Sequence, residues 1–254
     1  MLIILSSSKS FKILKNESCN GYTIPCFLDE SLELVAELRK LSIDKISKIL
    51  KVSPDLAQLN FERYKNWQLP FTPQKSNQAI LSFYGDVFKS LKVDDFSSKD
   101  FDYAQENLRI ISGLFGMLRP KDLIHPYRLE MGTNLPYNGI DNLYAFWRDK
   151  IINKLNTYFE NNSDKTIVDL ASHEYFNVID EKKLKARIVH IEFKETSESG
   201  YKVVAIYSKK ARGLMARYSI KNRIYNVEDF KKFDFENYRY NQNISTESIW
   251  VFTR

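Results

Sequence analysis

The sequence has few of the residues that usually hold metal ions or form disulfides. Its two cysteines, Cys19 and Cys26, match no metal or redox spacing, and without a secretion signal we expect both to be free thiols in a reducing cytoplasm. Its three histidines, His125, His173 and His190, are scattered as singles, which favours a structural or surface role for each. We therefore predict no metal and no cofactor.

Long apolar runs are also missing. No segment approaches the roughly 18 uninterrupted apolar residues of a membrane-spanning helix, so we expect no membrane contact. The N-terminus, MLIILSSSKSF, has four apolar residues after Met1 and no basic region before them, which predicts a first β-strand and not a signal peptide. We expect a cytoplasmic protein and favour a monomer, although no pattern fixes the oligomeric state.

Glycine is scarce and unevenly distributed. Three of the eight glycines, Gly113, Gly116 and Gly132, fall in the stretch Ile110–Gly132. Glycine is useful where the chain turns at positive φ or where another group approaches closely. Two interpretations fit this stretch: the floor of a functional cleft, or a buried strand followed by a turn-rich connection. The glycines alone do not separate them.

The order of predicted elements indicates the fold class. A chain of 254 residues suits one large domain or two small ones, and no repeat or convincing linker divides it. Apolar spacing and capping residues predict helices at residues 29–40, 43–51, 54–67, 98–107, 141–158 and from 209 onward. Apolar runs predict strands at residues 2–5, 79–84, 109–118, 166–171, 187–194 and 201–208. We predict an α+β (mixed α/β) fold in one compact domain, with a helical subdomain at about residues 29–75.

The charge balance favours anionic partners. The net charge is +6, and the segment Lys209–Arg223 carries six basic residues and no acid. On a helix, Ala211, Leu214, Met215 and Tyr218 form an apolar stripe for the core. The basic residues form two ridges beside that stripe: Lys210, Arg217 and Lys221 on one flank, Arg212 and Arg223 on the other. The ridges predict a surface facing an anion; a solvated helix surface is the competing interpretation.

The predicted helix pair at Ile43–Trp67 resembles a helix-hairpin-helix DNA-binding motif. Lys51-Val52-Ser53 would form its turn, with Val52 in the core and the free amides of the helix beginning at Pro54 facing a phosphate. Lys48, Lys51 and Arg63 would add positive charge. Both glycines expected in that turn are missing, so an ordinary αα-hairpin fits the pattern as well.

Isolated polar groups after predicted strands form a second candidate site. Ser7, Ser8 and Lys9 follow the first strand, where α/β proteins often bind ligands. Arg128 and Glu130 share one face of an extended segment. A small-ligand pocket would be built from Lys9, Asp86, Arg128, Glu130, Ser172 and Glu174. No nucleophile elbow, P-loop or dinucleotide fingerprint is present, so the chemistry of such a pocket stays open.

Seven phrases, in order along the whole chain, resemble the YaaA family of bacterial peroxide-stress proteins. They are the first strand with Lys9, GDVF at Gly85–Phe88, SGLFGMLRP at Ser112–Pro120, YRLEMG at Tyr127–Gly132, YAFW at Tyr144–Trp147, DLASHEY at Asp169–Tyr175 and KKARGLMARY at Lys209–Tyr218. Ser7-Ser8 departs from the family, which has proline and a small residue before the lysine. This departure changes the rigidity of the turn but keeps the lysine.

The resemblance implies a cytoplasmic bacterial protein of the hydrogen peroxide response that limits damage from intracellular iron. It also implies DNA binding through a positively charged cleft and a fold outside the common superfolds, but no settled catalytic activity. We expect DNA, with little sequence preference, to contact Lys9, Lys48, Lys51, Val52, Ser53, Arg63, Arg119, Arg128, Lys209, Lys210, Arg212 and Arg217. The alternatives are an enzyme acting on a small phosphorylated or nucleotide-like substrate, and a scaffold for protein partners.

Overall fold

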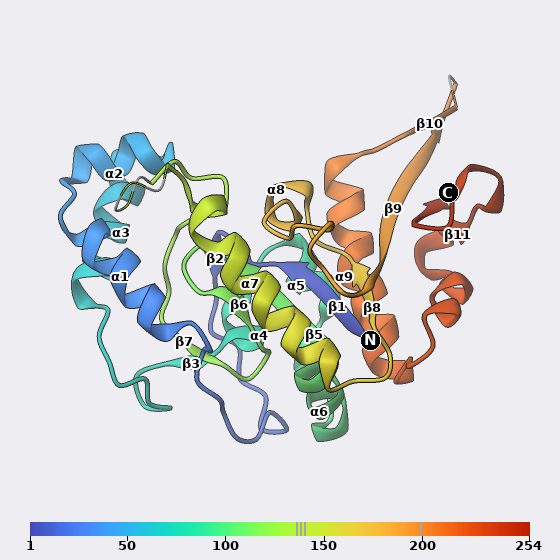
Figure 1. Ribbon diagram of the computed structural model, residues 1–254, viewed down its shortest axis with the longest axis horizontal. Helices are drawn as coiled ribbons and strands as arrows, with labels where there is room; N and C mark the ends of the chain where they lie inside the picture. The colour runs from blue at the N-terminus through green and yellow to red at the C-terminus, as the bar shows by residue number, and fades with distance from the viewer. Residues whose placement is uncertain (136, 138, 140, 199) are drawn as a thin grey trace.

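A mixed β-sheet runs through the middle of the computed structural model, which describes residues 1–135, 137, 139, 141–198 and 200–254. Its strands are β1 (Leu2–Ser6), β5 (Leu108–Ser112), β6 (Gly116–Leu118), β8 (Thr166–Asp169), β9 (Arg187–Ser197), β10 (Gly200–Lys202), β11 (Arg239–Tyr240) and β12 (Ile249–Thr253). The order across the sheet is β11-β12-β9-β8-β1-β5-β6, with β10 paired to β9 (Figure 1).

The central strands form because their sequences are almost wholly apolar. β1 is buried between β5 and β8 and is parallel to both, so that Ile3 lies beside Leu108 on one side and Val168 on the other. Parallel strands covered on both faces typically have such continuous apolar runs. The strands predicted at residues 2–5 and 166–171 are confirmed, the second ending two residues early at Asp169.

The connections around β1 create one functionally favourable edge. The chain leaves β1, returns on one side of it as β5, and later returns on the other side as β8. Ligands of open α/β sheets bind at the carboxyl ends of the strands, where neighbouring connections diverge in this way. Here that edge brings together the segments after β1, β5 and β8, which begin at Ser7, Gly113 and Leu170.

Three helices near the N-terminus contact one another, in the region where a helical subdomain at about residues 29–75 is predicted. They are α1 (Leu28–Arg39), α2 (Ile43–Leu50) and α3 (Pro54–Asn66), at the left of Figure 1. The side chains of Ser42 and Ser53 cap α2 and α3, and Pro54 occupies the first turn of α3. Buried residues of these helices belong to the same hydrophobic cluster as the sheet, so the molecule has one core.

The remaining helices cover the sheet. α7 (Leu143–Glu160) crosses in front of the central strands in Figure 1 and contacts β6, whereas α9 (Ala205–Asn222) packs on β9. α9 also contacts α5 (Asp86–Leu91) and α6 (Ser98–Asn107). The shorter elements are β2 (Ser10–Phe11), β3 (Asn77–Gln78), α4 (Ala79–Ser82), β4 (Phe83–Tyr84), η1 (Val93–Asp95), β7 (Leu123–Ile124), α8 (His173–Phe176), η2 (Val227–Lys232), η3 (Phe235–Asn237) and η4 (Gln242–Ile244). Within the described residues, no helix is long and apolar enough to cross a bilayer.

Two strand predictions need correction. The apolar run at residues 79–84 is a single helical turn, α4, followed by the two-residue strand β4. The run at residues 201–208 leaves the sheet after Lys202 and becomes helical at Ala205. Both runs are too short for their apolar spacing to distinguish a strand from a helix.

The glycine-rich stretch Ile110–Gly132 begins as a hairpin of β5 and β6. Gly116 has a φ of +64° in the turn, and a Cβ there would lie 2.6 Å from the Trp147 ring. At Gly113 a Cβ would lie 2.2 Å from the backbone oxygen of Leu129. Close packing therefore explains these two glycines, as the buried-strand interpretation predicts.

Candidate functional site

A pocket of about 480 Å³ lies between the α2–α3 hairpin and the carboxyl edge of the central strands. We call it the edge pocket. Residues from four separate parts of the chain line it: Lys9, Lys48, Ile49, Leu50, Lys51, Arg128, Glu130, Gly132, Thr133, Asn134 and Glu174. The second half of the glycine-rich stretch thus forms one wall, as the cleft interpretation predicts.

An ion cluster centred on Glu130 forms one wall of the edge pocket. Glu130 Oε1 accepts from Lys9 Nζ at 3.1 Å, and from Nε and Nη2 of Arg128 at 3.1 Å each. The Glu130 side chain is nearly buried, and its other oxygen, Oε2, has no hydrogen-bond partner within the part of the chain that the structure describes. One oxygen is therefore fully used, while the other is buried without a partner among the described residues.

Buried hydroxyl groups form hydrogen bonds next to this ion cluster. The Tyr127 hydroxyl lies 2.6 Å from Ser112 Oγ at the end of β5, and Tyr64 on α3 donates to the backbone oxygen of Arg128. Burial raises the pKa of Tyr127 to about 12 and also raises that of Tyr175, so both phenols stay protonated at neutral pH. These tyrosine side chains therefore carry no charge at neutral pH.

A second carboxylate, that of Glu174, faces the pocket from the segment after β8. The Ser172 amide donates to Ser6 Oγ at 2.8 Å, which ties this segment to the end of β1. Glu174 Oε1 accepts from the Gly132 amide at 3.2 Å, and a Cβ on Gly132 would lie 3.1 Å from the same oxygen. Gly132 therefore lets the two segments approach each other.

The α2–α3 hairpin supplies the other wall. Lys51 ends α2 with a φ of 52° and a ψ of 53°, the left-handed conformation that the missing glycine would adopt easily. Val52 is half-buried against the core, and Ser47 Oγ donates to its backbone oxygen at 2.7 Å. The hairpin therefore forms without glycine, and Lys48 and Lys51 line the pocket from it.

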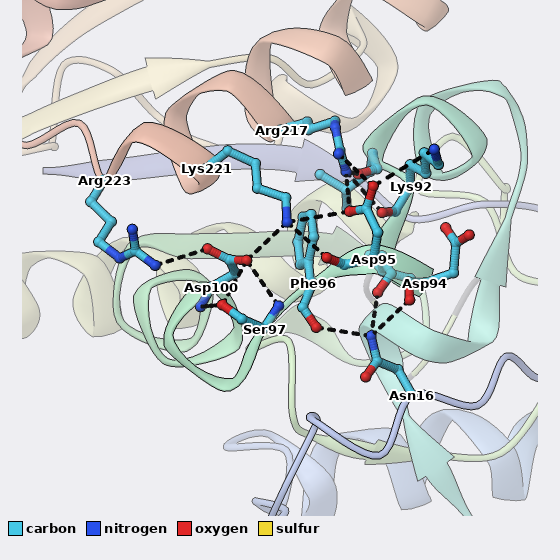
Figure 2. Close-up of polar contacts among 12 residues, drawn as sticks. Asn16, Lys92, Asp94, Asp95, Phe96, Ser97, Asp100, Arg217, Lys221 and Arg223 are labelled. Atoms are coloured by element: carbon cyan, nitrogen blue, oxygen red, sulfur yellow. Dashed lines mark hydrogen bonds and ion pairs between the residues drawn. The ribbon is translucent and has the colours of Figure 1, made fainter.

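Arg217 and Lys221 of α9, together with Arg223 directly after it, lie elsewhere and form the ion pairs that Figure 2 shows. Arg217 binds both carboxylate oxygens of Asp95, at 2.7 and 2.6 Å, and the hydrogen bond from Arg217 is the main reason that the pKa of Asp95 falls to about 2. Lys221 and Arg223 bind Asp100 at 3.0 and 3.1 Å. Arg217 and Lys221 from one predicted ridge and Arg223 from the other therefore fasten the C-terminal part of α9 to η1 and α6.

The rest of the predicted DNA-binding set is dispersed. Lys210 pairs with Glu236, Lys209 is exposed, and Arg212 is largely buried, where desolvation lowers its pKa. Arg63 lies over the Phe11 ring at 5.8 Å. Arg119 pairs with Asp122 at 3.6 Å and lines a separate cavity of about 380 Å³.

The predicted small-ligand set is better gathered. Lys9, Arg128, Glu130 and Glu174 line the edge pocket, Ser172 lies behind it at 3.2 Å from Ser6, and Asp86 begins α5. No sequence signal pointed to Thr133 and Asn134, because neither residue type stands out in a loop. The described residues contain no group of three or more His, Cys, Asp or Glu placed to hold a metal ion.

The pairing of His190 with Asp169 was also not predicted. His190 Nδ1 lies 2.9 Å from Asp169 Oδ2, and this hydrogen bond raises the pKa of His190. The two residues occupy paired positions on the adjacent strands β8 and β9, which explains the contact. Sequence spacing could not show this register.

Comparison with known proteins places these features in a family. Residues 1–244 match a family model described as peroxide stress protein YaaA. The chain is also 42% identical, over 254 residues, to a protein of Colwellia psychrerythraea named "UPF0246 protein", with 100% of this chain and 99% of the relative covered.

Proposed function

The chain belongs to the YaaA family of peroxide stress proteins, and we propose that it is a cytoplasmic protein that binds DNA in the response to hydrogen peroxide. The observation that supports DNA binding is the set of cations around the edge pocket. Lys9 follows β1, Lys48 and Lys51 come from the α2–α3 hairpin, and Arg128 comes from the glycine-rich stretch. Cations gathered from separate segments are typical of a site for phosphates.

The α2–α3 hairpin would hold the DNA backbone in the manner of a helix-hairpin-helix motif. Lys51 has the left-handed backbone of a tight turn, and α3 begins shortly after it at Pro54, where the positive end of the helix dipole favours anions. Phosphates would contact this side of the pocket most closely, because Lys9 and Arg128 on the opposite side are already paired with Glu130. Such contacts position a duplex but do not read its sequence.

The test is a salt titration of DNA binding by fluorescence anisotropy. We expect Lys48→Glu with Lys51→Glu to weaken duplex binding by more than about 10-fold at low salt. It should also reduce the slope of log affinity against log salt by about 2, since each phosphate contact contributes roughly 0.9 to that slope. The matched control is Lys99→Glu with Lys182→Glu, which makes the same charge change at two exposed residues outside the set lining the pocket.

The control separates a specific contact from a general effect of charge. Equal losses in the two double variants would show that the hairpin is not the contact surface. No binding by the unaltered protein at low salt would overturn the proposal itself. Protection of DNA would also account for a role against iron-linked damage, without direct binding of iron.

A second candidate function is that of an enzyme acting on a small phosphorylated or nucleotide-like substrate. The size of the edge pocket, about 480 Å³, favours it, because small-molecule sites typically measure roughly 300–1,000 Å³. Calorimetric titration with nucleoside monophosphates in the absence of DNA distinguishes the two. Tight binding of a free nucleotide, with no binding of duplex, would favour the enzyme.

A further inference from the structure

The unpartnered oxygen of Glu130 indicates a ligand that carries a hydrogen-bond donor. Glu130 is only 7% exposed, and its Oε1 already accepts from Lys9 and Arg128. Its Oε2 is buried without a partner among the residues that the structure describes, although buried polar atoms are nearly always hydrogen-bonded. A carboxylate oxygen can only accept, so the missing partner must be an N–H or O–H donor.

The rest of the edge pocket narrows the ligand further. Lys48 and Lys51 favour a phosphate on the hairpin side, whereas Glu130 and Glu174 exclude a phosphate from the opposite side. Ile49 and Leu50 add an apolar surface between these charges. A nucleotide matches this arrangement of a basic side, an apolar surface and an acidic side, because it carries a phosphate at one end and a flat base with N–H donors at the other.

We propose that the edge pocket receives a single nucleotide swung out of bound DNA, and that a small turn of the Glu130 side chain exposes Oε2 to an N–H donor of its base. This inference rests on the proposed DNA binding. A base inside a duplex cannot reach a buried carboxylate, so the nucleotide must rotate out of the stack. Extrusion is easiest for a mismatched or damaged base, which would direct the protein to lesions without any reading of sequence.

The pocket is open enough for such a base. Its volume of about 480 Å³ lies in the range of small-molecule sites, and the hydrogen bond between Glu174 and the Gly132 amide holds two of its walls together. No aromatic ring is found among the described residues that line it. A fluorescent base would therefore enter without being quenched by a stacked ring.

The test uses a duplex with 2-aminopurine at a mismatch, because this base brightens when it leaves the stack and carries an exocyclic amino donor. Anisotropy of a distant dye on the same duplex reports binding separately. We expect saturating protein to raise the 2-aminopurine emission several-fold. Glu130→Gln can keep an acceptor for Lys9 and Arg128 but replaces the free acceptor with an N–H donor, so it should bind the duplex within about 3-fold of the unaltered protein and lose most of the rise.

Two further variants guard against misfolding and general charge effects. Asn134→Met enlarges an exposed side chain that lines the pocket without removing Glu130 and without adding a ring that could quench 2-aminopurine, and it should also reduce the rise at saturating protein. Glu106→Gln removes an exposed carboxylate of α6 that is not in the set lining the pocket, and it should behave as the unaltered protein does. Far-ultraviolet circular dichroism checks that each variant is folded.

The outcomes separate this inference from the proposed function. Duplex binding with unchanged 2-aminopurine emission would overturn extrusion and leave DNA binding intact. A full rise with folded Glu130→Gln would overturn the role of Glu130. Absence of duplex binding by the unaltered protein would overturn both, since the nucleotide is taken to arrive in bound DNA.

Discussion

Replacement of Arg217 by methionine tests whether the basic face of α9 stabilises the fold or contacts a partner. The pair with Asp95 lowers the pKa of that carboxyl from 3.8 to about 2, mainly through the hydrogen bond from Arg217. A difference of this size corresponds to about 2.4 kcal/mol at 1.36 kcal/mol per pKa unit. Because the Asp95 side chain is 38% exposed, solvent screening reduces the contribution to about 1–1.5 kcal/mol.

Arg217 also donates to the backbone oxygens of Leu91 and Lys92, at 3.2 and 2.9 Å. Loss of these hydrogen bonds adds roughly 0.5–1 kcal/mol, whereas methionine keeps most of the apolar stem. We therefore expect Arg217→Met to lower the free energy of unfolding by about 2 kcal/mol at pH 7. The melting temperature should fall by about 4–8 °C for a chain of this size.

Differential scanning calorimetry at several pH values checks the assignment to Asp95. Since the folded-state pKa of Asp95 lies below its unfolded value, its contribution is present above pH 4 and is lost as the pH falls toward 2. The gap between Arg217→Met and the unaltered protein should therefore narrow over that range. Lys209→Met, at an exposed position of the same helix, should change the melting temperature by less than about 1 °C. Unchanged stability of Arg217→Met combined with lost DNA binding would refute this reasoning and favour a DNA contact.

Three other predictions follow from the backbone and the thiols. Lys51→Gly should raise the free energy of unfolding, measured by urea denaturation, by about 0.5–1 kcal/mol. The reason is that the left-handed conformation costs a residue with a Cβ more free energy than glycine loses in backbone entropy. A loss of stability would contradict this prediction. Gly113→Ala should destabilise by roughly 3 kcal/mol or more, since its Cβ would lie 2.2 Å from the Leu129 oxygen; a near-neutral urea midpoint would show that the segments can separate. Burial raises the pKa of Cys19 to about 11, so iodoacetamide should label Cys19 slowly at pH 7, more slowly than the exposed Cys26, and faster as the pH rises; rapid labelling of Cys19 at pH 7 would contradict this.

Local sequence signals predicted the elements around the site well. The apolar runs of β1 and β8 and the serine caps of α2 and α3 are short-range features, and each is confirmed within one or two residues. Their positions also explain why Lys9 and Glu174 line the same pocket, because the carboxyl ends of parallel strands share an edge.

Long-range pairing could not be predicted in this way. The segment Lys209–Arg223 contains no acid, which suggested unpaired basic ridges, yet Asp95 and Asp100 neutralise one of them from more than 110 positions earlier in the chain. Only the packing of α9 against η1 and α6 brings these charges together (Figure 2). A helical wheel shows which residues share a face, but not what lies opposite that face.

The glycine-rich stretch combines a buried strand with one wall of the edge pocket, and close backbone packing links these two parts. Gly113 lets the end of β5 pack directly on the backbone of Leu129, and Tyr64 on α3 donates to the backbone oxygen of Arg128. The segment that carries Arg128 and Glu130 is therefore held by the sheet on one side and by the helical hairpin on the other. Since an extended segment points alternate side chains to the same face, fixing its backbone at Leu129 sets the direction of both charged side chains. The buried strand is thus what positions the pocket wall, and a packing defect at Gly113 should disturb ligand binding before it disturbs the distant strands β9 and β12.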